Sequence, residues 1–196
     1  GDHVDAVAHG DLAVLEHART FATLPEAVAG CDAVVGTSAG TGRVPELPLE
    51  EWQTVAASLP AGRTALVFGS EKTGLGVEEI SYCHRLARIS TRPEAPSMNL
   101  GQAVAVCAYE RTRSAQPEAA PAARLAGLDA AQRERVVQAW MPLLERLGAV
   151  QPEHRGGQQR LVREMLSRWR PTPADARRLL GIARQLGHTL GGRRPG

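Results

Sequence analysis

The sequence predicts an α/β protein built on a parallel sheet and followed by a small all-helical module. Short runs of apolar and β-branched residues predict buried strands at 32–35, 64–68 and 86–90. Helical patterns separate these runs, and strands that alternate with helices are typical of a parallel sheet with crossover connections. A chain of 196 residues is long enough to bury a substantial core in one or two domains.

Three helices, and a helical turn around 77–80, are expected in this first part of the chain. Thr23 is followed three residues later by Glu26, which is the spacing of a capping box, so a short helix should begin there. A second helix is expected over 48–59. The third should run from about Ser97 to Arg113, with the Ser97 hydroxyl as its N-cap.

A loop rich in glycine or polar residues follows each predicted strand, at 36–42, 69–76 and 91–97. Ligands of parallel sheets bind at the carboxyl ends of the strands, so these loops form the expected binding region. Loop 69–76 lacks both the Gly-Lys-Ser/Thr ending of a phosphate loop and the glycine spacing of a dinucleotide fingerprint. On its own it fits either a ligand held by main-chain groups or an ordinary tight turn.

The composition excludes several classes of protein. No apolar run approaches the ~20 residues that cross a bilayer, so a membrane-spanning protein is not expected. The three cysteines lack metal-ligand spacing, which argues against a zinc site and against a disulfide scaffold. No secretion signal is recognisable, and so few cysteines suit a reducing compartment. We therefore expect a cytoplasmic protein without a metal.

The chain is predicted to divide into a sheet domain at 1–113, a linker at 114–127 and a helical module at 128–196. The linker is rich in Ala and Pro and has no apolar periodicity. Three amphipathic helices are expected in the module, and Pro142 should kink or split the first of them.

The second of these helices is marked by an apolar stripe of Leu161, Met165, Leu166 and Trp169. Trp140 and Trp169 lie on apolar stripes, which favours burial in the core over stacking with nucleic-acid bases. His84, which precedes the third strand, is expected to be a surface histidine at a helix end rather than a general base.

Charge is distributed unevenly along the chain. Residues 1–150 contain 13 basic and 18 acidic side chains, whereas residues 151–196 contain 10 and 3. The basic end fits either RNA binding or an ordinary solvated surface. Four arginines that fall away from the apolar stripes are the candidate RNA contacts: Arg160, Arg163, Arg177 and Arg184.

Two loops together resemble a known enzyme family. The loop that contains Gly69, Glu71 and Gly74 is followed, about twenty residues later, by Pro96-Ser97-Met98-Asn99-Leu100 at the start of a helix. In order and spacing these segments resemble the second and third motifs of the SpoU/TrmH branch of the SPOUT methyltransferases. The stretch 34–39 and the helical module are similar to the TrmJ-like subgroup, which methylates a ribose 2′-hydroxyl in the tRNA anticodon loop.

The resemblance implies that S-adenosylmethionine binds between the three loops. The residues it assigns to the cofactor are Thr37, Ser38, Ala39, Gly69, Ile89, Pro96, Ser97 and Met98. It also implies a C-terminal trefoil knot in the sheet domain and a homodimer formed through helices beside the cofactor. The stripe of Leu100, Val104 and Cys107 would then lie either in the core or at the subunit boundary, and its pattern alone favours the core.

For catalysis the resemblance points to Ser97 and Asn99 as polar contacts to the ribose or the loop, and to Glu71 as a brace that accepts loop N–H groups. The alternatives are that Ser97 is only an N-cap, Asn99 only a residue of the first helical turn, and Glu71 only a solvated carboxylate. Arg43 is the basic residue nearest to Gly40, where relatives often carry Arg. The family's first motif, which holds a catalytic Arg, is not found, so the chain is expected to begin after it and its own turnover is in doubt. The rivals are a non-catalytic RNA-binding protein and an rRNA 2′-O-methyltransferase.

Overall fold

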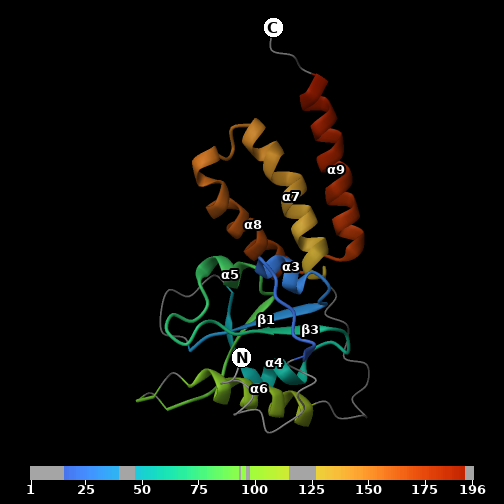
Figure 1. Ribbon diagram of the computed structural model, residues 1–196. Coiled ribbons are helices and arrows are strands. Elements are labelled where there is room, and N and C mark those ends of the chain that lie inside the picture. The colour runs from blue at the N-terminus through green and yellow to red at the C-terminus, as the bar shows by residue number, and fades with distance from the viewer. Residues whose placement is uncertain (1–15, 40–46, 93, 96–97, 115–126, 193–196) are drawn as a thin grey trace.

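A computed structural model describes residues 16–39, 47–92, 94–95, 98–114 and 127–192. Within these residues four strands form one parallel sheet in the order β2-β4-β1-β3. The α/β class and the parallel sheet are therefore confirmed (Figure 1). The strands are β1 (Ala33–Thr37), β2 (Leu49–Glu51), β3 (Thr64–Val67) and β4 (Arg85–Arg88).

The central strand β1 is buried on both faces. Val34 and Val35 have no exposed surface, and they point to opposite faces because side chains alternate along a strand. Val35 packs with α4 (Trp52–Ala57) and α6 (Leu100–Ser114), while Val34 packs with α3 (Leu24–Val28). The short helix α5 (Val77–Ser81) lies on the same side as α3 (Figure 1). The sheet is therefore the middle layer of three, as a parallel sheet requires.

The strand β2 lies inside the segment that the sequence assigned to a helix. Residues 48–59 divide into this three-residue strand, which pairs with β4, and α4, which begins only at Trp52. A three-residue edge strand carries too little pattern to be recognised locally, and its pairing partner lies 37 residues away at Arg88. The expected capping box is also absent, because the Thr23 side chain makes no capping hydrogen bond.

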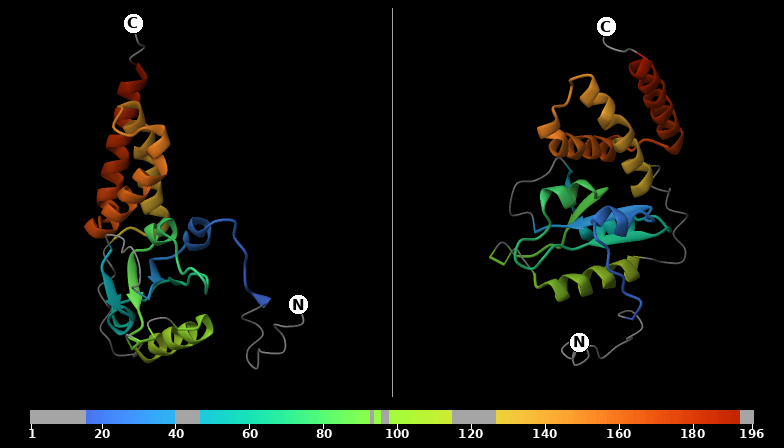
Figure 2. Two further views of the ribbon diagram at one scale, coloured as in Figure 1. Left: turned by 90° about the vertical axis from the view of Figure 1, so that its left-hand side faces the viewer. Right: turned by 45° about the horizontal axis from the view of Figure 1, so that its top comes forward.

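The helical module consists of α7 (Ala130–Arg146), the 3₁₀ turn η1 (Pro152–His154), α8 (Arg155–Trp169) and α9 (Pro173–Gly192). It stands on the side of the sheet away from α6 (Figure 2). The helix α7 packs against both α8 and α9 around a core that includes Val137, Met141 and Leu166. Pro142 does not split α7, which continues through it, since one missing N–H removes a single helical hydrogen bond.

The helix α8 turns a different face inward from the one its sequence predicts. Of its apolar stripe only Leu166 is buried, while Leu161 and Trp169 are 44% and 65% exposed. The buried face instead carries Arg163 and Ser167, because it packs against the polar rim of the sheet layer as well as against α7. The expected burial of Trp169 is therefore wrong. Within the described part of the chain, no helix has the length and apolar character needed to cross a bilayer.

Candidate active site at the carboxyl edge of the sheet

The three predicted loops leave the sheet side by side, at what we call the carboxyl edge, the ends of β1, β3 and β4. Thr37 Oγ1, at the end of β1, donates to the Val67 carbonyl at 3.1 Å. The Ser38 N–H donates to the Ala87 carbonyl at 2.9 Å. Thr37 and Ser38 are thereby fastened to the two strands from which the second and third loops depart.

The second loop is folded tightly on itself and depends on glycine. A Cβ placed on Gly69 would lie 2.0 Å from the carbonyl carbon of Gly74 and 2.2 Å from the Leu75 nitrogen, so no side chain fits there. Gly74 adopts φ +68°, a left-handed conformation that glycine reaches without strain. Its N–H donates to the Ser70 carbonyl at 2.8 Å and closes the turn. The backbone of this loop is therefore preformed.

A side-chain hydrogen bond joins the second loop to the third. Asn99 Nδ2 donates to Glu71 Oε1 at 2.7 Å, across 28 residues of chain. The other amide atom, Asn99 Oδ1, accepts the N–H groups of Gly101 at 2.9 Å and Gln102 at 3.4 Å, and so caps α6. Asn99 therefore caps α6 and also joins the two loops. Glu71 was predicted to accept hydrogen bonds from loop N–H groups, and it accepts one from the side-chain amide of Asn99.

The other predicted site residues divide into those that the structure places and those that it does not. Ala39 is exposed at the carboxyl edge, and Ile89 and Met98 are half-buried. Ile89 packs against the core cluster beneath α4 and α6. Pro96, Ser97 and Arg43 lie outside the described residues.

A polar cluster that the sequence does not reveal lies where β2 and β4 end. The Glu51 carboxylate accepts hydrogen bonds from Arg88 Nε at 2.5 Å and from the Ser90 hydroxyl. The bond from Ser90, followed by that from Arg88, lowers the pKa of Glu51. This cluster fixes β2 to the start of the third loop, and it could not be foreseen because 49–51 has no recognisable strand pattern.

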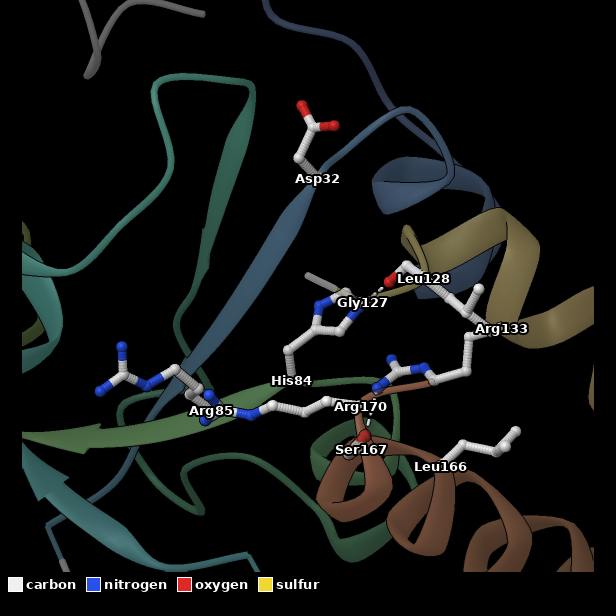
Figure 3. A pocket seen from close by; sticks show the side chains of 9 residues that line it. All are labelled: Asp32, His84, Arg85, Gly127, Leu128, Arg133, Leu166, Ser167 and Arg170. Carbon is white, nitrogen blue, oxygen red and sulfur yellow. Dashed lines mark hydrogen bonds between the residues drawn. The ribbon is translucent and has the colours of Figure 1, made fainter. Parts of the chain in front are cut away.

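A cavity lies at the opposite side, the amino edge, where β1 and β4 begin. It has a volume of about 30 Å³, room for a single water molecule, and lies between the sheet and the helical module (Figure 3). Its lining includes His84, Arg133 and Arg170. Its size and position separate it from the three loops, so it is not the candidate cofactor site.

His84 is a structural bridge at this amino edge and not a surface histidine, so that prediction is wrong. Its Nδ1 accepts the Val34 N–H at 2.9 Å. Its Nε2 donates to the Leu128 carbonyl at 3.1 Å, as Figure 3 shows. Burial, together with the charge of Arg133, lowers the pKa of His84 to about 3. Both ring nitrogens are occupied, so His84 has no free acceptor for a substrate proton.

Arg163 is buried at the same interface, which contradicts its prediction as an RNA contact. Only 2% of its side chain is exposed. Its guanidinium donates to Glu134 at 2.9 Å and to Glu78 at 2.8 Å, and lies 4.1 Å from the centroid of the Tyr82 ring. The prediction placed Arg163 on the solvent face of α8 because the apolar stripe alone was expected to face inward.

Arg133 makes a second buried attachment between the module and the sheet layer. It donates to the Cys83 carbonyl at 3.0 Å and also to the Tyr82 carbonyl and the Ser167 hydroxyl. Burial lowers the pKa of Arg133 to about 10, so it stays charged at neutral pH. Of the remaining predicted RNA contacts, Arg160 is half-buried and Arg177 and Arg184 are exposed. No cluster of metal-ligating side chains occurs in the ranges that the structure describes.

Comparisons with known proteins identify the class. The model of the SpoU rRNA Methylase family matches residues 1–109. The chain belongs to this family, as its loop motifs predicted.

Two relatives and one solved structure extend the match into the helical module. The chain is 34% identical over 194 residues to the tRNA (cytidine/uridine-2′-O-)-methyltransferase TrmJ of Klebsiella pneumoniae, covering 90% of this chain and 76% of that protein. It is 33% identical over 189 residues to the enzyme of the same name from Pectobacterium atrosepticum, with the same coverage. The crystal structure of TrmJ from Z. mobilis superposes with a TM-score of 0.82 at 25% identity, covering 95% of this chain and 81% of that one.

Proposed function

We propose that this protein is an S-adenosylmethionine-dependent 2′-O-ribose methyltransferase that acts on tRNA. The observation that carries the proposal is the meeting of three loops at the carboxyl edge, tied by Thr37 to Val67, by Ser38 to Ala87 and by Asn99 to Glu71. The TrmJ relatives are tRNA (cytidine/uridine-2′-O-)-methyltransferases by name, and they match 90% of this chain.

The second loop is suited to a ligand that is held by main-chain groups. Its backbone is fixed by Gly69 and Gly74, and glycine lets main-chain N–H and C=O groups approach a ligand closely. Bound S-adenosylmethionine would supply the methyl group on a sulfonium centre. The residues proposed to hold it are Thr37, Ser38, Ala39, Gly69, Ile89, Pro96, Ser97 and Met98.

In the proposed reaction the chain orients the attacking ribose and the loops around it. The ribose oxygen must approach the methyl carbon in line at about 3 to 3.5 Å, which demands rigid loops. Glu71 and Asn99 supply part of that rigidity through their 2.7 Å hydrogen bond. We assign Ser97 and Asn99 to polar contacts with the ribose or with the loop that binds the cofactor.

The helical module is proposed to hold the RNA backbone. Arg177 and Arg184 are exposed on α9, seven residues apart and therefore on one face of that helix. With the half-buried Arg160 they keep the role that the sequence gave them, and Arg43 is proposed to act nearer the cofactor. We further propose that the methylated nucleotide lies in the anticodon loop.

A homodimer is proposed through the outer face of α6. Cys107 is fully buried in the core, whereas Val104 is 43% exposed and Tyr109 is 65% exposed. The predicted stripe therefore divides between the core and an outward face suited to a second copy. The trefoil knot, the domain limits at 113 and 128 and a cytoplasmic location complete the proposal.

The test combines cofactor binding with methyl transfer. Calorimetric titration should show S-adenosylmethionine binding, and incubation with unmodified tRNA should transfer one methyl group to a ribose that mass spectrometry can locate. Ribosomal RNA serves as the competing substrate. Binding without transfer to either RNA would favour a non-catalytic RNA-binding protein, and transfer to rRNA alone would replace the tRNA assignment.

A further inference from the structure

The outer face of α8 carries an apolar stripe that nothing in the described part of the chain covers. Leu161, Met165 and Trp169 are spaced four residues apart and so lie on one face of the helix. Leu161 is 44% exposed, Trp169 is 65% exposed and Met165 is half-buried. Leu166, at the border of this stripe, is buried, and so is Arg163 on the far side of the helix. Exposed apolar surface of this kind commonly marks an interaction site.

Trp169 stands on a turn that is fixed to the sheet layer. It is the last residue of α8, and the N–H of the next residue, Arg170, donates to the Leu166 carbonyl at 3.1 Å. Arg170 adopts φ 48° and ψ 52°, a left-handed conformation that residues other than glycine seldom adopt. In the same turn, the Ser167 hydroxyl donates to the Cys83 carbonyl at 3.3 Å. The indole is therefore presented from a rigid support.

Arginines are concentrated near this tryptophan in the sequence. Four exposed arginines lie within ten residues of it, at the end of α8 and the start of α9: Arg168, Arg170, Arg177 and Arg178. Arg170 lies beside the start of β4 (Figure 3). The one carboxylate between residues 168 and 178 is Asp175, and it accepts hydrogen bonds from the Thr172 N–H at 2.9 Å and hydroxyl at 2.7 Å.

This charge decides which partner suits the exposed indole. A second copy of the chain that used the same patch would bring two arginine clusters together, and like charges repel. An RNA strand supplies both a flat base for the indole and phosphates for the arginines. We propose that Trp169 stacks on an unpaired nucleotide of the RNA substrate, and that the surrounding arginines bind the neighbouring phosphates. The inference rests on the proposed function, since it takes RNA to be the substrate.

The nucleotide bound here is not the one that is methylated. Ser167, two residues before Trp169, bonds to Cys83 at the amino edge of the sheet, whereas the candidate cofactor loops leave the carboxyl edge. Trp169 therefore acts as a remote anchor for the RNA. A remote contact that is equal in the ground state and the transition state changes KM and leaves kcat unaltered.

The test uses the full chain with three variants and an unmodified tRNA transcript. Trp169→Ala should weaken tRNA binding about tenfold, the usual effect of removing one stacked base. Trp169→Phe keeps a stacking ring and should bind within about twofold of the original protein. Leu161→Ala is the matched control, because it lies on the same stripe about 12 Å away and should also change binding by less than about twofold.

Fluorescence reports the stack directly. The chain has three tryptophans, and Trp52 is buried and Trp140 half-buried, so the emission most accessible to acrylamide belongs to Trp169. Saturating tRNA should protect this emission from acrylamide, and the protected component should be missing in Trp169→Phe.

Two results would overturn the anchor. One is Trp169→Ala binding tRNA as tightly as the original protein. The other is an equal loss of self-association in Trp169→Ala and Leu161→Ala with tRNA affinity unchanged, which would make the stripe a protein interface. If the original protein methylates tRNA in either case, the proposed function stands and the anchor alone fails. If tRNA protects Trp169 but receives no methyl group, the proposed function fails and the anchor stands.

Discussion

The carboxyl edge of the sheet presents backbone, glycine and exposed polar side chains, whereas the amino edge is closed by buried arginine and histidine side chains. At the first edge Gly69 leaves no room for a side chain, and the ties between loops are single neutral or exposed hydrogen bonds. At the amino edge, Arg133 and Arg163 together donate hydrogen bonds to partners in the sheet layer and in the helical module. The difference teaches that one edge is shaped to admit a ligand and the other to hold the helical module in place.

The largest expected effect tests the amino edge. Arg163→Met should lower the free energy of unfolding by about 3 kcal/mol, because the half-buried Glu134 carboxylate loses its ion-pair partner. Urea unfolding would measure the loss. Arg184→Met, which alters an exposed arginine, should change stability by less than about 0.5 kcal/mol. S-adenosylmethionine affinity of the folded Arg163→Met variant should match the original, and a large loss there would mean that the two edges are coupled.

Acid should also act mainly through the amino edge. The pKa of His84 is about 3 in the folded protein against an ordinary value of 6.5, so below pH 6.5 the unfolded chain takes up a proton that the folded chain does not. The contribution of His84 to the free energy of unfolding should be fully present above pH 6.5. It should then fall by up to about 1.4 kcal/mol per pH unit as the pH drops toward 3. Urea unfolding at several pH values would measure this slope.

The variant His84→Gln isolates that histidine. Glutamine can donate and accept like the neutral ring but does not titrate, so most of the slope between pH 6.5 and 5 should vanish. The carboxylates with lowered pKa values, such as Glu51 and Glu134, lose their stabilising charge at lower pH and should not contribute in this window. An unchanged slope in His84→Gln would show that other groups cause the acid sensitivity.

A glycine substitution tests the carboxyl edge. In Gly69→Ala the new methyl group would overlap the backbone of Gly74 and Leu75, so the loop must shift, at a cost of about 1 to 3 kcal/mol. We expect S-adenosylmethionine affinity to fall more than about tenfold in calorimetry. Gly181→Ala on α9, where a Cβ meets nothing within 4 Å, is the matched control and should leave affinity unchanged. Equal affinity in both variants would remove the second loop from the cofactor site.

The smallest expected effect separates the two roles of Asn99. Asn99→Ala loses the cap of α6, for about 1 kcal/mol, and the tie to Glu71. Asn99→Asp keeps the capping oxygen but loses the donor and faces the Glu71 carboxylate with a like charge. The melting temperature of Asn99→Asp should therefore match that of the original protein, while cofactor affinity should fall several-fold in both variants. Loss of affinity only in Asn99→Ala would mean that the cap, and not the tie, supports the site.

Local pattern was sufficient where a segment's own residues fix its state. The predicted strands at 32–35, 64–68 and 86–90 overlap the observed strands β1, β3 and β4, whose ends lie within two residues of the predicted ones. The order of the motifs pointed to Glu71 and Asn99, which the structure brings together. The local pattern failed for β2, whose three residues form a strand only because β4 lies beside them. It failed again for Arg163, whose partners Glu78 and Glu134 are 85 and 29 residues away.

The amino-acid sequence by itself determined the class of fold, the three loops that follow the strands, and the glycines that shape the second loop. Only the tertiary structure decided that α8 turns Arg163 inward and Trp169 outward. Periodicity shows which residues share a face of a helix but not what that face will meet. A face that meets a rim of carbonyls and carboxylates buries arginine, because the bonds made there replace those lost to water.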